Sequence, residues 1–127
     1  MKEEYILKKL YNLLEDKKSE NIVIYQVSDV SYIADYLVIC TASSEIHINA
    51  IINSILKDVN KWQAKIYQID GEKRSNWVSI DFGFIILHIM SYEVREKYSL
   101  ESIWGDCKKI DYKEYTDEPL NRAKRNY

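Results

Sequence analysis

The fold of this 127-residue chain is decided by residues 77–105, WVSIDFGFIILHIMSYEVREKYSLESIWG. Residues 77–81 alternate in side-chain type, Phe82 and Gly83 suit a tight turn, and residues 84–90 form an apolar run interrupted only by His88. Alternation followed by an apolar run is typical of a β-hairpin whose second strand is buried on both faces. The sequence therefore predicts a hairpin at the centre of a sheet.

Two short helices are expected directly after this hairpin. Ser91 can cap a helix over 92–97, and Glu93 in its first turn suits the positive end of the helix dipole. Ser99 can cap a second short helix, which Gly105 would end in a left-handed conformation. The hairpin thus carries a densely polar segment at its end.

Apolar side chains recur at helical spacing in two segments nearer the N-terminus. The first stripe consists of Ile6, Leu7, Leu10, Leu13 and Leu14. A longer helix follows, which either Ser43 or Ser44 can cap, and its apolar face consists of Ile48, Ile51, Ile52, Ile55, Leu56 and Val59. Each stripe needs a sheet to cover.

Further strands are predicted over 22–27, 35–41 and 64–69. The order of strand, long helix and strand predicts a right-handed crossover and at least one parallel pair, and the hairpin adds antiparallel neighbours. We therefore expect an α/β (α+β) fold with a mixed five-stranded sheet flanked by helices. Residues 1–111 form one domain in this interpretation, and residues 112–127 form a tail that is mobile over its last ten residues.

Composition excludes several classes of function. A net charge of −2 gives no overall field that would attract a polyanion. The two cysteines, Cys40 and Cys107, fit a reduced cytoplasmic protein, and no apolar run is long enough for a signal sequence or a membrane span.

Motifs for catalysis are mostly missing. None of the three glycines belongs to a phosphate-binding loop, and the histidines and cysteines lack the spacing of metal ligands, so we expect no cofactor and no metal. Cys40 with a histidine as its base is the sharpest enzyme hypothesis, but a thiol in an apolar strand is favoured to be packed and inert. His88 is interpreted as a core histidine, hydrogen-bonded to Asp81 across the hairpin.

What remains is a mixture of aromatic, acidic and basic side chains that matches interface hot spots better than active sites. Its members are Trp77, Asp81, His88, Glu93, Arg95, Tyr98 and Trp104. The alternative for Trp77 and Trp104 is that each simply completes the core.

The chain contains four ordered segments, of which the last three include these residues: DYLVICTASS at 35–44, WVSIDFG at 77–83, His88 with Ile89, and E-x-R-x-x-Y-x-L-E-x-x-W-G-D at 93–106. Together they resemble the Iojap-like ribosomal silencing factor family (RsfS), from about the first helix to Asp111. The resemblance implies a fold like that of nucleotidyltransferases without the catalytic motif, because no Gly-Ser pair with a following Asp-x-Asp is present.

The resemblance implies a translational repressor that is not an enzyme. Such a protein binds the large ribosomal subunit via ribosomal protein fourteen of that subunit, blocks subunit joining when nutrients are scarce, and can form a homodimer. The positions it marks as partner-binding are Trp77, Asp81, Gly83, His88, Glu93, Arg95, Tyr98, Leu100 and Trp104. Where family members commonly carry an acid after the hairpin glycine, this chain has Phe84.

Two other classes stay open. The first is a divergent nucleotidyltransferase-like enzyme. The second is an RNA-binding ribosome-assembly factor, for which Lys108, Lys109 and the basic residues of the tail are the candidates for contact with ribosomal RNA.

Overall fold

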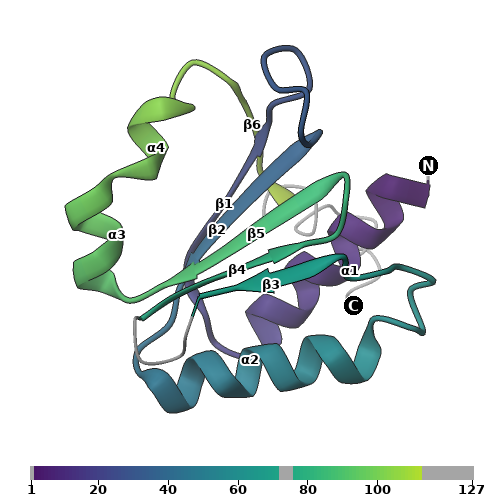
Figure 1. Ribbon diagram of the computed structural model, residues 1–127, viewed down its shortest axis with the longest axis vertical. Helices are drawn as coiled ribbons and strands as arrows, with labels where there is room; N and C mark the ends of the chain where they lie inside the picture. Colours follow the sequence, from purple (N-terminus) through teal and green to yellow (C-terminus); the bar gives the residue numbers. More distant parts are fainter. Residues whose placement is uncertain (1, 72–75, 113–127) are drawn as a thin grey trace, which may run out of the picture.

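The computed structural model describes residues 2–71 and 76–112, and in them it forms one mixed sheet with helices packed on both faces (Figure 1). The elements follow in the order α1 (Lys2–Asp16), β1 (Glu20–Gln26), β2 (Tyr36–Thr41), α2 (Glu45–Asp58), β3 (Gln68–Asp70), β4 (Trp77–Asp81), β5 (Ile85–Met90), α3 (Tyr92–Tyr98), α4 (Leu100–Ile103) and β6 (Lys108–Ile110). Within the described residues, no helix combines the length and the apolar character needed to cross a bilayer.

The predicted hairpin is confirmed as β4 and β5, which pair antiparallel with Trp77 opposite Met90. Its turn is fixed by Asp81, whose Oδ1 accepts the backbone N–H of Gly83 at 2.7 Å. Gly83 has a φ of 95°, a conformation that strongly favours glycine. β5 lies inside the sheet, in the strand order β3-β4-β5-β2-β1-β6, as the apolar run requires.

The sheet has six described strands, so the prediction of five was wrong. The added strand is β6, which pairs antiparallel with β1 at one edge. The strand predicted over 64–69 is the short β3 at the other edge, Gln68–Asp70. One parallel pair exists as predicted, but it joins β2 to β5 and not to β3. β2 and β3 are not neighbours in the sheet, because β4 and β5 lie between them.

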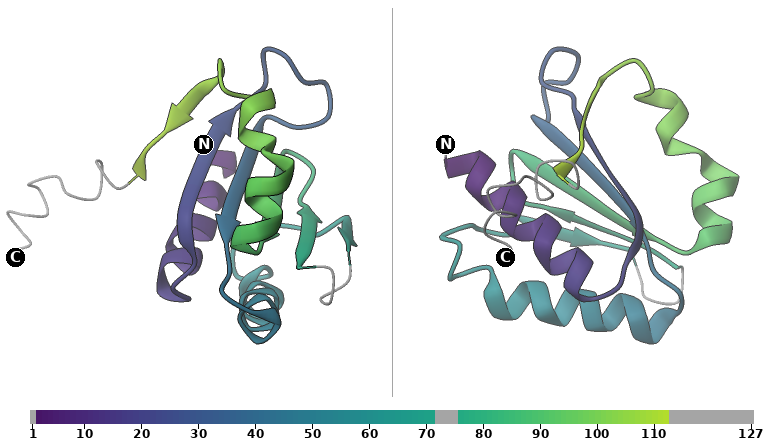
Figure 2. Two further views of the ribbon diagram at one scale, coloured as in Figure 1. Left: turned by 90° about the vertical axis from the view of Figure 1, so that its left-hand side faces the viewer. Right: turned by 180° about the vertical axis from the view of Figure 1, so that it is seen from behind.

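The sheet separates two apolar layers, and the two views of Figure 2 show the helices on either side of it, from the side and from behind. α1 and α2 cover one face, and their fully buried side chains include Leu7, Leu10, Leu14, Ile48, Ile51 and Ile55. On the other face, Val94, Leu100 and Trp104 from the α3–α4 segment pack against Ile39 and Met90. The α3–α4 segment is therefore part of the folded body and has a fixed place on the sheet.

Two of the predicted helix starts are confirmed. Ser44 caps α2 by accepting the backbone N–H of His47, and Ser91 caps α3 by accepting that of Val94. Ser99 lies between α3 and α4 with a φ of 50°, and its side chain makes no capping bond. The left-handed residue of this segment is thus Ser99, and the expectation of that conformation at Gly105 was wrong.

The tail predicted from residue 112 onward can be followed only at Tyr112, whose ring lies 5.5 Å from that of Tyr11 on α1. Residues 113–127, including the ten predicted to be mobile, lie outside the described residues.

Candidate functional site

A groove of about 550 Å³ lies between α3 and the strands β4 and β5. Its lining includes Trp77, Ser79, His88, Val94, Lys97 and Tyr98. We call it the aromatic groove, because the rings of Trp77 and Tyr98 lie 5.1 Å apart with 45° between their planes. Asp70 and Gly71, at the end of β3, close one side of it.

His88 orients the indole of Trp77. The Trp77 Nε1–H group donates to His88 Nδ1 at 3.0 Å, which requires the neutral imidazole with its proton on Nε2. The prediction that His88 bonds to Asp81 was wrong, because the Asp81 carboxylate accepts the backbone N–H of Gly83. Burial lowers the pKa of His88 from its ordinary value of 6.5, which favours the same neutral form.

This arrangement predicts a loss of stability in mild acid. Since the pKa of His88 is lowered only in the folded protein, its contribution to stability is present above pH 6.5 and is lost as the pH falls below that value. We expect the unfolding temperature to decrease between about pH 7.5 and about pH 5.5.

The matched variant is His88→Asn, whose side-chain oxygen can accept the indole N–H but does not titrate. The decrease should be smaller in this variant, while Asp70 and Lys97, the charged groups that line the same groove, are unchanged. Equal decreases in both proteins, measured by thermal unfolding, would contradict the role assigned to His88.

The predicted partner-binding residues do not form one continuous surface. Trp77, His88 and Tyr98 meet in the aromatic groove, and Leu100 and Trp104 are half-buried beside it in the same apolar layer. Asp81 and Gly83 lie at the far end of β4, roughly 13 Å along the strand from Trp77. Glu93 is exposed on α3.

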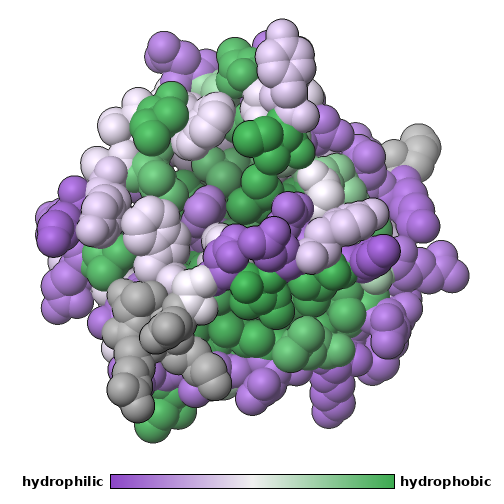
Figure 3. Space-filling view, viewed as in Figure 1, coloured by the Kyte–Doolittle hydropathy of each residue, from purple (hydrophilic) through white to green (hydrophobic). Residues whose placement is uncertain are grey.

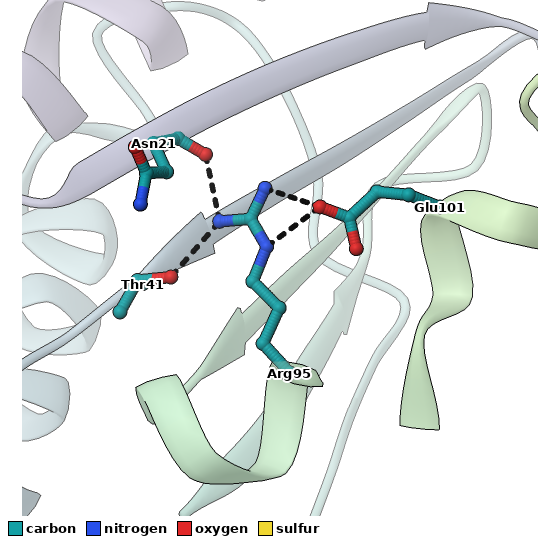
Figure 4. Close-up of polar contacts among 4 residues, drawn as sticks. All are labelled: Asn21, Thr41, Arg95 and Glu101. Carbon is teal, nitrogen blue, oxygen red and sulfur yellow. Dashed lines mark hydrogen bonds and ion pairs between the residues drawn. The ribbon is translucent and has the colours of Figure 1, made fainter. Parts of the chain in front are cut away.

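Arg95 is the one predicted partner-binding residue that is buried. It is only 9% exposed, and its guanidinium is bonded within the protein to Asn21, Thr41 and Glu101 (Figure 4). Arg95 therefore lies beneath the surface that its neighbours present.

Sequence reasoning missed Val94 and Lys97 as lining residues of the aromatic groove. A signal was available, because Val94 and Tyr98 are four residues apart and share one face once the helix predicted over 92–97 is extended by one residue, as α3 is. Asp70 and Ser79 carried no comparable signal, since their place depends on how β3 and β4 pair.

The enzyme hypothesis built on Cys40 lacks the necessary geometry. Cys40 is completely buried, and desolvation raises its pKa to about 12. Cys40 pairs with Ile89 and Ile39 pairs with His88, so Cys40 and His88 lie on opposite faces of the sheet. The ring nitrogens of His47 lie 2.9 Å from the backbone nitrogen of Ser43 and 2.7 Å from the carbonyl oxygen of Lys17. Neither histidine is placed to serve Cys40 as a base.

A thiol titration can test this conclusion. We expect a thiol reagent to modify Cys107, which is half-buried, in the native protein, and to modify Cys40 only after unfolding. Labelling of Cys40 in the native protein as fast as in denaturant would revive the catalytic hypothesis. Among residues 2–71 and 76–112, no three His, Cys, Asp or Glu side chains are grouped to hold a metal ion.

Known proteins resemble this chain in sequence and in fold. A ribosomal silencing factor RsfS from Halalkalibacterium halodurans is 31% identical over 111 residues, which cover 87% of this chain and 95% of that protein. A mouse protein named mitochondrial assembly of ribosomal large subunit protein 1 is 30% identical over 98 residues, covering 75% of this chain and 43% of its own length.

A solved structure of a protein from Chromobacterium violaceum superposes with a TM-score of 0.74 at 27% identity, covering 81% of this chain and 86% of that one. The family described as ribosomal silencing factor during starvation (RsfS) matches residues 1–127, and the chain belongs to this family.

Proposed function

We propose that this protein represses translation by binding the large ribosomal subunit through ribosomal protein fourteen of that subunit, which prevents the small subunit from joining. Family membership supports action on the ribosome, and the name of the mouse relative links that protein to the large subunit. The observation that carries the proposal is the aromatic groove, in which Trp77 and Tyr98 offer ring surface beside polar groups. Such aromatic side chains dominate the binding energy of protein interfaces.

The surface around the aromatic groove adds further area for a partner. Tyr92, Tyr98 and Ile103 are 62%, 52% and 65% exposed, although they belong to a segment packed on the sheet. Figure 3 shows apolar side chains and side chains of intermediate hydropathy over α3 and α4, on the left of the view. These three side chains add exposed apolar area that a protein partner can cover, although other exposed apolar side chains, such as Tyr32 and Ile33, lie outside this segment.

The charges near the aromatic groove are mixed, because Lys97 lines it together with Asp70, and only the acids suit a basic partner. Asp70 lies in its lining and Glu93 is exposed on α3, so both can meet Arg or Lys side chains of a ribosomal protein. Complementary charge of this kind speeds encounter and makes binding sensitive to salt.

The proposed mechanism is steric and needs no chemistry. A standard interface covers on the order of 800 Å² per partner, about a tenth of the 7747 Å² that this protein exposes. The rest of a 15.1 kDa body then projects from the subunit face and obstructs the approaching small subunit. The repressor is therefore a regulatory protein in this proposal and not an enzyme.

The nucleotidyltransferase alternative has little support in the site. Two-metal nucleotidyl transfer needs several clustered carboxylates, whereas Asp81 uses its carboxylate to hold the hairpin turn.

The RNA-binding alternative is weakened by the position of Lys108 and Lys109. They are neighbours on β6, so their side chains alternate between the two faces of this edge strand, and the groove that both of them line also contains the acids Glu4 and Asp111. Contact of either lysine with ribosomal RNA at the rim of the interface, and a homodimer that uses the aromatic groove, are lesser parts of the proposal.

The test is subunit joining in vitro. Purified small and large subunits are mixed with a molar excess of the protein, and their association is followed by light scattering and gradient sedimentation. We expect fewer joined ribosomes and co-sedimentation of the protein with large subunits alone. Unchanged joining at saturating protein would overturn the proposal.

A further inference from the structure

We propose that Arg95 is a positioning residue that locks α3 and α4 onto the sheet and so holds the aromatic groove in its binding shape, without touching the partner itself. The part of this inference that concerns binding rests on the proposed function, whereas the part that concerns the shape of the groove does not.

One side chain connects four elements. Arg95, on α3, makes a two-point contact with Glu101 on α4, with Nε donating at 2.8 Å and Nη2 lying 2.7 Å from the same carboxylate oxygen. Its Nη1 donates to the carbonyl oxygen of Asn21 on β1 at 2.7 Å and to the hydroxyl of Thr41 on β2 at 2.9 Å. Figure 4 shows these contacts converging on the guanidinium.

The contact with Asn21 compensates an irregularity in the sheet. The register of β1 against β2 shifts between Glu20 and Val23, and Asn21 has a φ of 51°. Such a bulge interrupts the regular ladder of backbone hydrogen bonds. Arg95 supplies the donor for the Asn21 carbonyl. The guanidinium of Arg95 therefore stabilises both the irregular start of β1 and the α3–α4 segment.

Only arginine can make this set of contacts. Its planar fork offers five N–H donors in fixed directions, whereas the lysine ammonium is compact and cannot reach three separate oxygen groups at once. Because Arg95 is buried, its removal leaves the oxygens of Asn21, Thr41 and Glu101 without this donor.

Apolar packing of Val94, Leu100 and Trp104 also holds the α3–α4 segment on the sheet, but α4 has little local structure of its own. α4 has four residues, begins at a left-handed Ser99 and has no side-chain bond at its N-terminus. A helix this short is not stable by itself. Tyr98, which stacks on Trp77, directly precedes the turn at Ser99, so displacement of the turn displaces one wall of the aromatic groove.

The three tryptophans allow a direct test in the intact protein. Trp77 lines the groove, Trp104 ends α4, and Trp62 is buried on the opposite face of the sheet. Proton–nitrogen NMR correlation spectra resolve their indole N–H signals. In Arg95→Met we expect the signals of Trp77 and Trp104 to shift or broaden while that of Trp62 stays in place.

Binding is measured on the same variants by co-sedimentation with purified large subunits. We expect Arg95→Met to weaken binding at least about tenfold. Arg95→Lys should behave like Arg95→Met, both in binding and in the indole signals of Trp77 and Trp104. Glu101→Gln, which removes the charge that Arg95 meets, should move the same two signals by less. Lys57→Met, which removes an exposed cation from α2 on the other face, serves as the matched control and should change nothing.

Two outcomes would overturn the inference. Lost binding with all three indole signals unchanged would make Arg95 a direct contact, and unchanged signals with unchanged binding would leave it without a role in the groove. Should Arg95→Met also shift Trp62, the decision passes to Arg95→Lys and Glu101→Gln, which must move Trp77 and Trp104 selectively. Failure of the unmodified protein to bind large subunits would refute the proposed function, while the NMR comparison still decides the lock.

Discussion

Replacing Trp77 by alanine is expected to weaken binding to large ribosomal subunits by about 2 kcal/mol, roughly thirtyfold, and to leave the fold intact. Trp77 forms a wall of the aromatic groove, stacks on Tyr98 and donates to His88, so its indole is both accessible and fixed in orientation. A rigid aromatic side chain loses little conformational freedom on binding, which makes it a strong anchor. Co-sedimentation over a series of protein concentrations measures the change.

Two variants control for this result. Trp77→Phe keeps a ring in the groove but cannot donate to His88, so we expect an intermediate loss of binding. Tyr32→Ala removes a fully exposed aromatic ring from the loop before β2, at the opposite end of the sheet, and should bind like the unmodified protein. Equal affinity of Trp77→Ala and the unmodified protein would exclude Trp77 as an anchor.

Substitution of Gly71 by alanine is expected to lower the free energy of unfolding by about 2 kcal/mol, with a loss of binding in addition. Gly71 has a φ of 97°, which side chains other than glycine rarely adopt. A Cβ atom at this position would lie 2.3 Å from the backbone oxygen of Trp77, far inside van der Waals contact. The backbone at the start of β4 must therefore move, and the indole that it carries moves with it.

Gly105→Ala is the matched control, because it is the same glycine-to-alanine change at a position that directly follows the C-cap of α4. A Cβ atom on Gly105 would approach no closer than 3.4 Å, to the oxygen of Glu101, and its φ is not in the left-handed range. We expect thermal unfolding of Gly105→Ala to resemble that of the unmodified protein. Similar unfolding temperatures for both alanine variants would show that the close approach at Gly71 is tolerated.

The parts of the fold with long periodic patterns were predictable from the sequence. α1, α2 and the hairpin of β4 and β5 each present several apolar side chains at one spacing, and all of them occur as expected. β3 and β6 contain three residues each, too few to show any alternation. Their places are fixed by pairing with β4 and β1, which local sequence does not encode.

The choice between Trp77 and Asp81 as the partner of His88 shows a second limit. His88 lies directly opposite Ser79, so Trp77 and Asp81 are its two diagonal neighbours on the same face. A large indole reaches across that diagonal, whereas a short carboxylate does not and finds the nearby N–H of Gly83. Sequence supplied the residue types of the site, but side-chain reach decided their pairing.

Arg95 shows a third limit. Arginine is mostly exposed in proteins, so its type alone points to the surface. Its burial depends on contacts with Asn21 and Thr41, which are 74 and 54 positions away in the chain. No local pattern records such distant neighbours.

The parallel pairing of β2 with β5 has a consequence for folding during synthesis on the ribosome. It joins residues 36–41 to residues 85–90, so an emerging nascent chain can complete neither apolar layer before Met90 has left the exit tunnel. Contacts of such high sequence separation slow folding, because a long loop must close first. Until then the edge of β2 that will pair with β5 has no partner strand, and an open apolar strand edge is a site for aggregation.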